Sequence, residues 1–318
     1  MNAFVLTESG AELRRDWPRP AARPGWTRVR TRVAGICNTD LELMRGYMGF
    51  CGVLGHEFVG IALDGAFAGA RVVGGINFAC GRCDECRHGS ERHCPKRQVL
   101  GILGADGVFA EEFVIPQRNL LVVPGKVSDH AAVFAEPVAA ACEILEQLGA
   151  YEVGPALVLG DGKLGALVAQ VLAGAGFEVT LVGHHVARLE WLEKRGVTLA
   201  AVRHEARRYA LVVEATGSAA GFADALAATK PRGTVVLKTT IASRHEVDLA
   251  PIVINEIRVL GSRCGPFGPA LERLAEGAVC VEELVDGVFP LERMEHAVRR
   301  ASEKGVRKIL VESDCESD

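Results

Sequence analysis

The sequence predicts an α/β protein in which β-rich segments flank a doubly wound parallel sheet. Residues 1–125 contain several short strand-like segments between Gly and Pro breaks. Between Ala156 and Leu260, apolar strand-like segments alternate with helical ones, which is typical of a parallel sheet covered by helices. Within this region, the stretch Ala156–Gly176 joins a buried strand to a helix through a tight glycine turn.

Composition indicates a soluble globular protein. A chain of 318 residues can form two domains with full cores, and 49% hydrophobic and 24% charged residues are ordinary values. A net charge of −4 argues against nucleic acid or an anionic membrane as partner. The apolar runs are too short to span a bilayer, and the N-terminal residues lack the pattern of a secretory signal. We therefore expect a cytoplasmic protein whose ten cysteines serve as metal ligands or buried thiols.

The segment Trp26–Ala34 is the clearest strand of the β-rich region. Val29, Thr31 and Val33 alternate with three arginines along it. A period of two is typical of a half-buried strand, and we interpret the arginines as its solvated face.

Two short motifs after this strand offer zinc ligands. Cys37-Asn38-Thr39-Asp40 follows the strand directly, and Gly55-His56-Glu57 comes shortly afterwards. Taken alone, a cysteine is usually core filling, and a histidine is usually a surface or satisfied core residue. Together the motifs supply thiolate, imidazole and carboxylate, which are all zinc ligand types.

The cysteine cluster Cys80-x2-Cys83-x2-Cys86-x7-Cys94 predicts a second metal site. Four closely spaced thiolates suit a closed tetrahedral zinc site. The alternative is a redox C-x-x-C, but that motif needs only two cysteines and normally begins a helix of a thioredoxin-like unit. We therefore predict a structural zinc at this cluster.

A long helix is predicted from Asp129 to Leu148, with a start signal at Ser128 or Asp129 and a stop at Gly149. It carries Glu136 and Cys142, two residues of types that can bind metals. Six residues turn a helix through about 600°, so Cys142 lies about 120° from Glu136 and cannot share its direction.

The glycine turn reads Gly160-Asp161-Gly162-Lys163-Leu164-Gly165, a G-x-G-x-x-G pattern between a strand and a helix. The first glycine allows the turn, the second lets the backbone approach a pyrophosphate, and the third allows close packing of helix and strand. The helix N-terminus would then hold the phosphates through free N–H groups and its dipole. The alternative is a tight connection without a ligand. The flanking strand and helix favour dinucleotide binding.

The second strand, Phe177–Val182, ends at Gly183 and not at an acidic residue. NAD-selective sheets of this kind usually carry Asp or Glu there, bonded to the ribose 2′-hydroxyl. His184, His185 and Arg188 could instead attract a 2′-phosphate, although all three could equally be surface residues at a helix start. On this basis we expect NADP(H) rather than NAD(H).

The remaining elements complete the alternation. Strands are predicted at Thr198–Val202, Ala210–Glu214, Thr234–Thr239 and Ile257–Leu260, and helices at Val186–Arg195 and Ala219–Ala228. Ligands of such sheets lie beyond the carboxyl ends of the strands, which predicts Thr216, Gly217 and Lys238 near the nicotinamide half. A helix at Leu291–Ser302 and a strand at Val306–Val311 complete the β-rich domain.

Taken together, the two ligand motifs, the four-cysteine cluster and the glycine turn resemble those of the zinc-containing medium-chain alcohol dehydrogenases in order and relative spacing. The resemblance implies a GroES-like β-rich catalytic domain, residues 1–126 and 265–318, interrupted by a doubly wound Rossmann coenzyme domain, residues 127–264. It also implies hydride transfer between a substrate and NAD(P). The substrate would be a carbonyl compound or an alcohol, which could be polyol-like or sugar-like. Homodimers or homotetramers are expected from the family alone.

The resemblance also implies roles for single residues. Cys37 and His56 would bind a catalytic zinc, and Glu57 and Glu136 are the candidates to complete its shell. The Glu136 position holds Cys in classical alcohol dehydrogenases and Glu in polyol, glucose and threonine dehydrogenases. Asp40 would orient His56, and Thr39 would pass the substrate proton outward.

Two departures and two alternatives remain. Glu42 stands where many family members have a relay histidine, and Lys238 has no role assigned by the family pattern. A zinc-independent quinone or enone reductase of the same superfamily would lack Cys37, His56 and the four cysteines. A non-catalytic relative should have lost a ligand or the phosphate loop, and none is lost.

Overall fold

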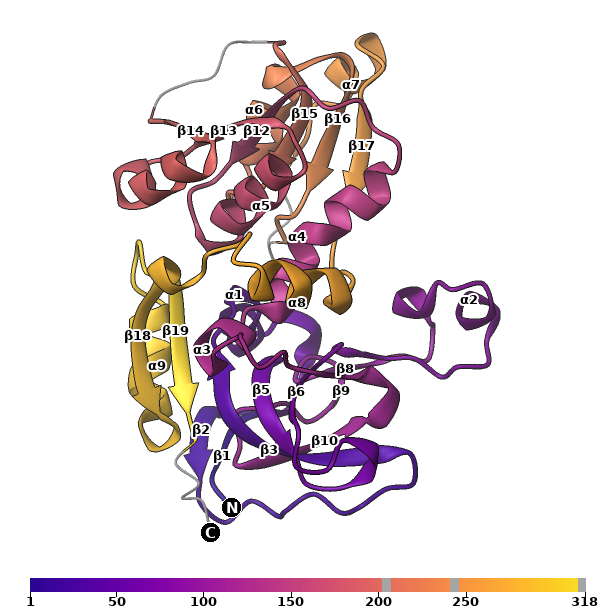
Figure 1. Ribbon diagram of the computed structural model, residues 1–318, viewed down its shortest axis with the longest axis vertical. Coiled ribbons are helices and arrows are strands. Elements are labelled where there is room, and N and C mark those ends of the chain that lie inside the picture. The colour runs from indigo at the N-terminus through magenta and orange to yellow at the C-terminus, as the bar shows by residue number, and fades with distance from the viewer. Residues whose placement is uncertain (202–206, 241–245, 314–318) are drawn as a thin grey trace. The chain divides into compact units, whose positions relative to one another are not determined.

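The computed structural model describes residues 1–201, 207–240 and 246–313. The chain divides into two compact units, one formed by Met1–Glu136 with Cys280–Asp318 and the other by Pro137–Val279 (Figure 1). The first unit is therefore discontinuous in sequence. The predicted domain boundaries, at 126/127 and 264/265, fall 10 and 15 residues before these divisions.

The described residues of the first unit form three sheets. Its largest has the strand order β11-β6-β5-β3-β19-β18, and β10 also pairs with β3. The strands of the unit are β1 (Ala3–Thr7), β2 (Gly10–Arg14), β3 (Trp26–Gly35), β4 (Gly52–Val53), β5 (Glu57–Ala62), β6 (Arg71–Gly74), β7 (Asn77–Phe78), β8 (Gln98–Leu100), β9 (Gly104–Ala105), β10 (Glu112–Pro116), β11 (Leu120–Val122), β18 (Val285–Pro290) and β19 (Lys308–Glu312).

Strand β3 organises the large sheet. Its buried positions alternate as predicted, with Val29, Thr31 and Val33 buried and the arginines more exposed. Gly35, at its end, pairs with the first residue of β5, Glu57, and with Leu310 of β19. The end of β3 therefore lies in the interior of the sheet, between the start of β5 and the middle of β19.

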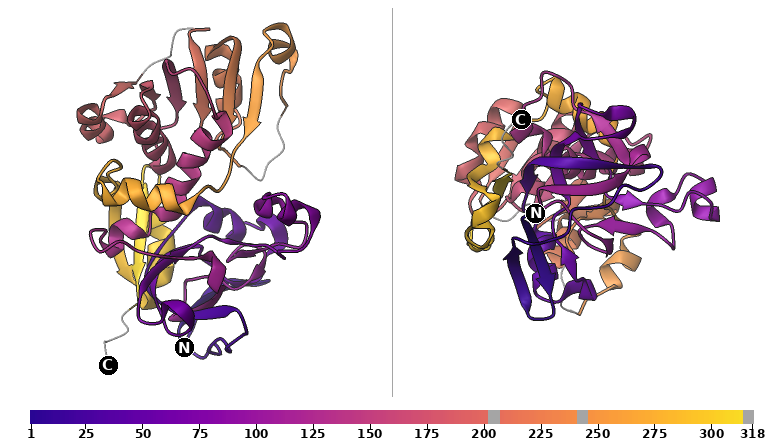
Figure 2. Two further views of the ribbon diagram at one scale, coloured as in Figure 1. Left: turned by 45° about the vertical axis from the view of Figure 1, so that its right-hand side comes forward. Right: turned by 90° about the horizontal axis from the view of Figure 1, so that it is seen from below.

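The predicted four-cysteine segment forms a lobe between β7 and β8. It contains the short helices α2 (Asp84–Arg87) and η3 (Glu91–His93). Figures 1 and 2 show this lobe projecting from the first unit. The remaining short helices of the unit are α1 (Asn38–Met44), η1 (Tyr47–Gly49), η2 (Gly65–Phe67), η4 (Gln117–Asn119), α3 (Asp129–Ala132), η6 (Glu282–Leu284), η7 (Leu291–Arg293) and α9 (Met294–Ala301).

The predicted helix Asp129–Leu148 is in fact two helices, α3 and α4 (Ala135–Leu148). Ser128 caps the first, because its hydroxyl accepts the Ala131 N–H at 3.1 Å. Pro137 explains the break. Its nitrogen cannot donate to the carbonyl of Val133, and its ring would clash with that carbonyl in a continuous helix.

Among its described residues, the second unit forms a six-stranded parallel sheet with the order β14-β13-β12-β15-β16-β17 (Figure 1). The chain reverses its direction of winding between β12 and β15, which is the order of a doubly wound dinucleotide-binding sheet. The elements are β12 (Pro155–Leu159), α5 (Lys163–Gly174), β13 (Glu178–Val182), η5 (Val186–Arg195), β14 (Val197–Ala200), β15 (Tyr209–Glu214), α6 (Gly221–Ala228), β16 (Thr229–Leu237), α7 (Ala250–Ile254), β17 (Arg258–Gly261) and α8 (Phe267–Ala275).

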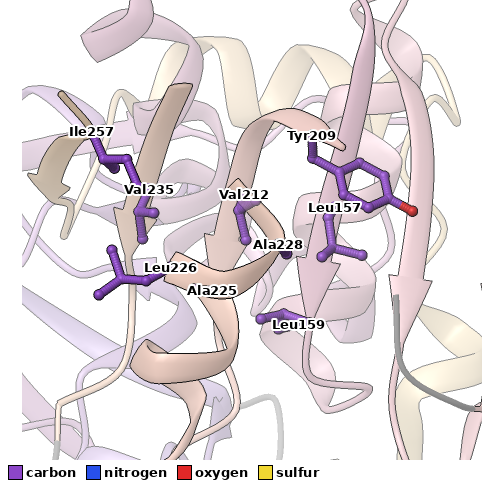
Figure 3. Packing of buried hydrophobic residues seen from close by; sticks show 9 residues of the cluster. All are labelled: Leu157, Leu159, Tyr209, Val212, Ala225, Leu226, Ala228, Val235 and Ile257. Atoms are coloured by element: carbon purple, nitrogen blue, oxygen red, sulfur yellow. The ribbon is translucent and has the colours of Figure 1, made fainter. Parts of the chain in front are cut away.

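The core of this sheet is apolar, as parallel strands buried on both faces require. Leu157, Val212 and Val235, from three neighbouring strands, are completely buried and pack with Ala225 and Leu226 of α6 (Figure 3). The predicted alternation of strands and helices is confirmed.

Three details differ from the predictions. The segment Val186–Arg195 is a 3-10 helix; with three residues per turn, its two buried leucines, three positions apart, share one face. The predicted strand end Val202 lies outside the described residues. The helix α8 belongs to the second unit, so the chain returns to the first unit at Cys280 and not near Gly265.

Candidate active site and metal centres

Cys37, His56 and Glu57 lie together in the first unit. Cys37 precedes α1, and Glu57 begins β5, directly after His56. One ligand atom from each residue lies within 4.8 Å of the others. The pairing of β3 with β5 brings these positions together, since Gly35 is opposite Glu57. The motifs that the sequence analysis combined thus form one cluster.

Asp40 contacts both ligand motifs, through Cys37 of the first and His56 of the second. It is completely buried, accepts the Cys37 N–H at 2.8 Å through Oδ2, and places Oδ1 3.2 Å from His56 Nδ1. Burial lowers the pKa of His56, but the Asp40 carboxylate and the Cys37 sulfur raise it, and the resulting pKa is well above the ordinary value. The surroundings of the ring therefore strongly favour a positive charge.

Lys308, the first residue of β19, enters the same cluster. Its ammonium contacts Glu57 Oε2, lies 3.5 Å from the Ile36 carbonyl oxygen and stands 5.3 Å from the centre of the Phe134 ring. Burial lowers the pKa of Lys308 to about 8, although Cys37 and Asp40 act in the opposite direction. Sequence reasoning missed this residue, because a lysine in a strand is normally expected at the surface.

The donor set of this cluster fits a divalent metal. With a thiolate at Cys37, the three potential anions Cys37, Asp40 and Glu57 outnumber the cationic groups Lys308 and His56, so negative charge remains in a buried place even when the imidazole is protonated. Glu57 Oε1 is buried and has no hydrogen-bond partner within the part of the chain described. A buried anionic group in this state is costly unless a cation pairs with it. Thiolate, imidazole and carboxylate are the ligands that zinc prefers.

Glu136 is the second residue of α4 and is half-buried. It is not a member of the three-residue cluster found among the described residues, so its role as a ligand remains a prediction. Cys142 lies further along the same helix and is buried. Burial raises its pKa, against a smaller lowering by Arg273, which fits a packing role.

Thr39 and Glu42 lie on α1 beside the cluster. The Thr39 hydroxyl is 3.8 Å from Cys37 Sγ, and Thr39 as a residue is partly exposed. Glu42, in the relay position, forms an ion pair with Arg45 at 2.6 Å.

The four cysteines of the lobe also lie within reach of one metal ion. The Sγ–Sγ distances are 3.4 Å for Cys83–Cys86, 3.7 Å for Cys83–Cys94 and 4.0 Å for Cys80–Cys86. A tetrahedral site with Zn–S bonds of about 2.3 Å requires sulfur separations of about 3.8 Å. The lobe therefore has the dimensions of a closed four-thiolate zinc site.

The thiol pKa values in the lobe support this conclusion. Backbone N–H groups of Arg82 and Cys83 lower the pKa of Cys80 to about 6. The Cys86 N–H lowers the pKa of Cys83, but partial burial and the neighbouring thiols raise it to about 12. Four sulfurs this close cannot all be thiolates without a cation between them.

The glycine turn has the geometry that the sequence analysis assigned to each glycine. Gly160 has φ +111°, and a Cβ there would overlap with the Ala215 carbonyl oxygen. A Cβ on Gly165 would overlap with the Gly160 carbonyl oxygen, whereas a Cβ on Gly162 would meet no described atom within 4 Å. The turn therefore packs closely at its first and third glycines and is open at the second. Lys163 and Leu164 begin α5, whose first N–H groups have no partner within the helix.

At the end of β13, the structure places a carboxylate that the sequence analysis did not expect. The Asp161 side chain lies against Gly183 and accepts the N–H of His185 through Oδ2. His184, His185 and Arg188 are exposed. The expectation of NADP(H) assumed that no carboxylate was present at this point, and that assumption is wrong.

Glu214, at the end of β15, organises the next loops. It is buried, and its Oε1 accepts bonds from the Thr216 N–H, the Thr216 hydroxyl and the Thr239 hydroxyl at 2.6–2.9 Å. The Gly217 N–H in turn donates to Thr239. Lys238 donates to the Ala140 carbonyl oxygen at 2.8 Å and to Ser262 Oγ at 3.2 Å. The ammonium thus links α4 to Ser262, the residue after β17. Its position beside the coenzyme remains a prediction.

Two models of known protein families match this chain, one in each unit. The model of the alcohol dehydrogenase GroES-like domain matches residues 23–125, and the zinc-binding dehydrogenase model matches residues 164–276. The chain belongs to the zinc-containing medium-chain alcohol dehydrogenases. As a member of this family, the dehydrogenase transfers a hydride between alcohol or carbonyl substrates and NAD(P).

Relatives resemble the dehydrogenase over nearly its whole length. D-altritol 5-dehydrogenase of Agrobacterium fabrum is 29% identical over 92% of this chain and 94% of its own. A zinc-binding dehydrogenase of Sinorhizobium meliloti, solved with NADP, is 27% identical with a TM-score of 0.87, covering 98% of both chains. A short chain alcohol dehydrogenase of Escherichia coli CFT073, solved with NADH, is 26% identical with a TM-score of 0.86, covering 98% of this chain and 99% of its own.

Among the residues that the structure describes, no helix combines the length and the apolar character needed to cross a membrane.

Proposed function

We propose that the dehydrogenase binds two zinc ions per chain and oxidises a polyol or sugar-like alcohol. The observation that carries this proposal is the buried cluster of Cys37, His56 and Glu57, whose excess negative charge and unpaired carboxylate oxygen fit a divalent cation. Zinc bound there would act as a Lewis acid that lowers the pKa of an alcohol and stabilises the charge on its oxygen. We further propose Glu136 as the ligand that completes the shell.

The residues around the cluster would have separate tasks. Asp40 fixes the orientation of the His56 ring through Nδ1, which leaves Nε2 for the metal. Thr39 Oγ1, beside Cys37, takes up the hydroxyl proton of the substrate and passes it to solvent. The Glu42 carboxylate is engaged by Arg45 and therefore would not replace a relay histidine.

The second zinc would be structural. The four lobe cysteines have the spacing of a closed tetrahedron, which leaves no position for substrate. Such a site stabilises the lobe by linking Cys80, Cys83 and Cys86 to Cys94, at the other end of the segment. A cytoplasmic location, which would keep these thiols reduced, is part of the proposal.

The coenzyme would bind at the carboxyl ends of β12, β13 and β15. Gly162 and the start of α5 would hold the pyrophosphate, and the loops ordered by Glu214 would face the nicotinamide half. Relatives were solved with NADP in one case and NADH in the other, so similarity leaves both coenzymes open.

The polyol substrate class rests on Glu136 and on the named activity of the altritol-oxidising relative. We also propose a homodimer or homotetramer. In support, β17 is an edge strand among the described residues, and Val253 and Ile254 of the preceding α7 are each 76% exposed.

The test is a panel of polyols and sugar alcohols assayed with both coenzymes on protein of known zinc content. Reduction of NAD(P) with at least one polyol is expected. It should disappear in Cys37→Ser and persist in Cys51→Ser, which changes an exposed cysteine outside both clusters. Equal activity in parent and Cys37→Ser would contradict the proposed catalytic site.

A further inference from the structure

Asp161 reaches from the glycine turn to the end of the neighbouring strand. It follows Gly160, whose N–H donates to the Val182 carbonyl oxygen at 2.8 Å, so the turn starts beside the last residue of β13. Asp161 Oδ2 then accepts the N–H of His185, two residues beyond Gly183. The carboxylate is thus held between the ends of β12 and β13.

Gly183 and Asp161 are sterically complementary. A Cβ on Gly183 would lie 2.5 Å from Asp161 Oδ2 and still closer to its Cβ and Cγ. The Asp161 carboxylate therefore fills the space that a side chain at Gly183 would need. In a doubly wound sheet, this is the position from which an acidic side chain binds the ribose 2′-hydroxyl of NAD.

From these contacts, we infer that Asp161 supplies the ribose-binding carboxylate and makes the dehydrogenase select NAD(H) over NADP(H). The inference rests on the proposed function, because it assumes that the glycine turn holds a nicotinamide dinucleotide. Asp161, a residue of the phosphate loop, would then bind the ribose hydroxyl in place of an acidic residue at the end of the second strand.

The carboxylate has the capacity for this bond. Its side chain is 16% exposed, so a ligand can reach it. Oδ2 holds the His185 N–H, and within the described residues Oδ1 accepts no hydrogen bond. A carboxylate offers several acceptor sites, and a ribose hydroxyl can donate to Oδ1.

The same carboxylate would repel a 2′-phosphate. The repulsion acts over a short distance in a partly buried place, where solvent screens it less than at the surface. His184, His185 and Arg188 oppose it, but these side chains are exposed, and exposed charge contacts contribute little. His185 Nδ1 lies 3.8 Å from Asp161 Oδ2, so part of its attraction for an anion is already directed to Asp161.

The test is the binding of NADH and NADPH to the zinc-loaded full-length chain, followed by nicotinamide fluorescence without substrate. The parent should bind NADH at least about tenfold more tightly than NADPH, the effect of one charge-assisted hydrogen bond. Asp161→Asn keeps an acceptor for the His185 N–H and removes the charge, so NADPH should bind about tenfold more tightly than in the parent. Glu190→Gln, a loss of one exposed charge on η5, should leave the NADH/NADPH ratio unchanged.

A double variant tests the position of the carboxylate. Asp161→Gly with Gly183→Asp moves the acid to the usual strand end and should restore the NADH preference that Asp161→Gly alone loses. A parent that prefers NADPH, or a ratio unmoved by Asp161→Asn, overturns the inference. An equal shift in Glu190→Gln overturns it too. Failure of both coenzymes to bind the parent would instead refute the proposed function.

Discussion

The Lys308 ammonium lies against the Glu57 carboxylate in the interior of the first unit, with side-chain exposures of 0% and 1%. Lys308 begins β19 and Glu57 begins β5, and both strands pair with the end of β3. Gly35 provides the space, since a Cβ there would lie 2.6 Å from Glu57 Oε2 and 2.7 Å from Lys308 Nζ. The ammonium thus engages one oxygen of a carboxylate whose other oxygen, Oε1, is buried and has no hydrogen-bond partner within the described part of the chain.

We predict that Lys308→Met destabilises the zinc-loaded protein by about 3–5 kcal/mol, because it leaves a buried carboxylate without its ammonium partner. Lys304→Met, at an exposed position, is the control and should have no effect. The neutral pair Glu57→Gln with Lys308→Met should recover much of the loss. Urea denaturation measures all three, and a Lys308→Met protein as stable as the control would contradict the importance of the pair.

Elemental analysis should give close to two zinc equivalents per chain. Cys37→Ser should retain one equivalent and its thermal stability but lose turnover, since the open site serves chemistry. Cys83→Ser should also retain one equivalent, but with a lower Tm, since the closed site serves folding. A parent value near one that persists in Cys83→Ser would contradict the structural site.

Glu136→Ala should reduce zinc affinity or turnover by at least about tenfold if the carboxylate completes the metal shell. Cys142→Ala, on the same helix, is the matched control. It should cost about 1–2 kcal/mol of stability as a buried truncation and leave zinc content unchanged. Competition with a chromogenic chelator measures the affinity, and the reverse pattern would mean that Cys142 is the ligand.

The sequence predicted the elements whose signals are local. The alternation along β3, the four-cysteine spacing and the glycine turn each lie within a short segment, and the structure forms all three. Joining Cys37 to His56 and Glu57 required the resemblance to a family, and the pairing of β3 with β5 explains why they meet.

The features that sequence reasoning missed depend on contacts between segments. Lys308 joins the cluster only through the pairing of β19 with β3. The direction of the Asp161 side chain depends on the conformation of the turn, so a search for an acid at the end of the second strand could not find it. The division of the predicted helix into α3 and α4 had a local signal in Pro137, which the apolar periodicity outweighed.

The last prediction separates the packing and binding roles of the glycine turn. Gly165→Ala would force a Cβ into the Gly160 carbonyl oxygen, so it should lower both stability and coenzyme affinity. Gly162→Ala meets open space and has a φ of −75°, which alanine adopts without strain, so its Tm should stay close to that of the parent.

Coenzyme affinity should nevertheless fall at least about tenfold in Gly162→Ala, because the methyl group would occupy the space through which the pyrophosphate approaches the backbone. Thermal denaturation and NADH fluorescence on the same samples measure the two effects. A Gly162→Ala protein that binds NADH as tightly as the parent would mean that the open side of the turn is not the phosphate site.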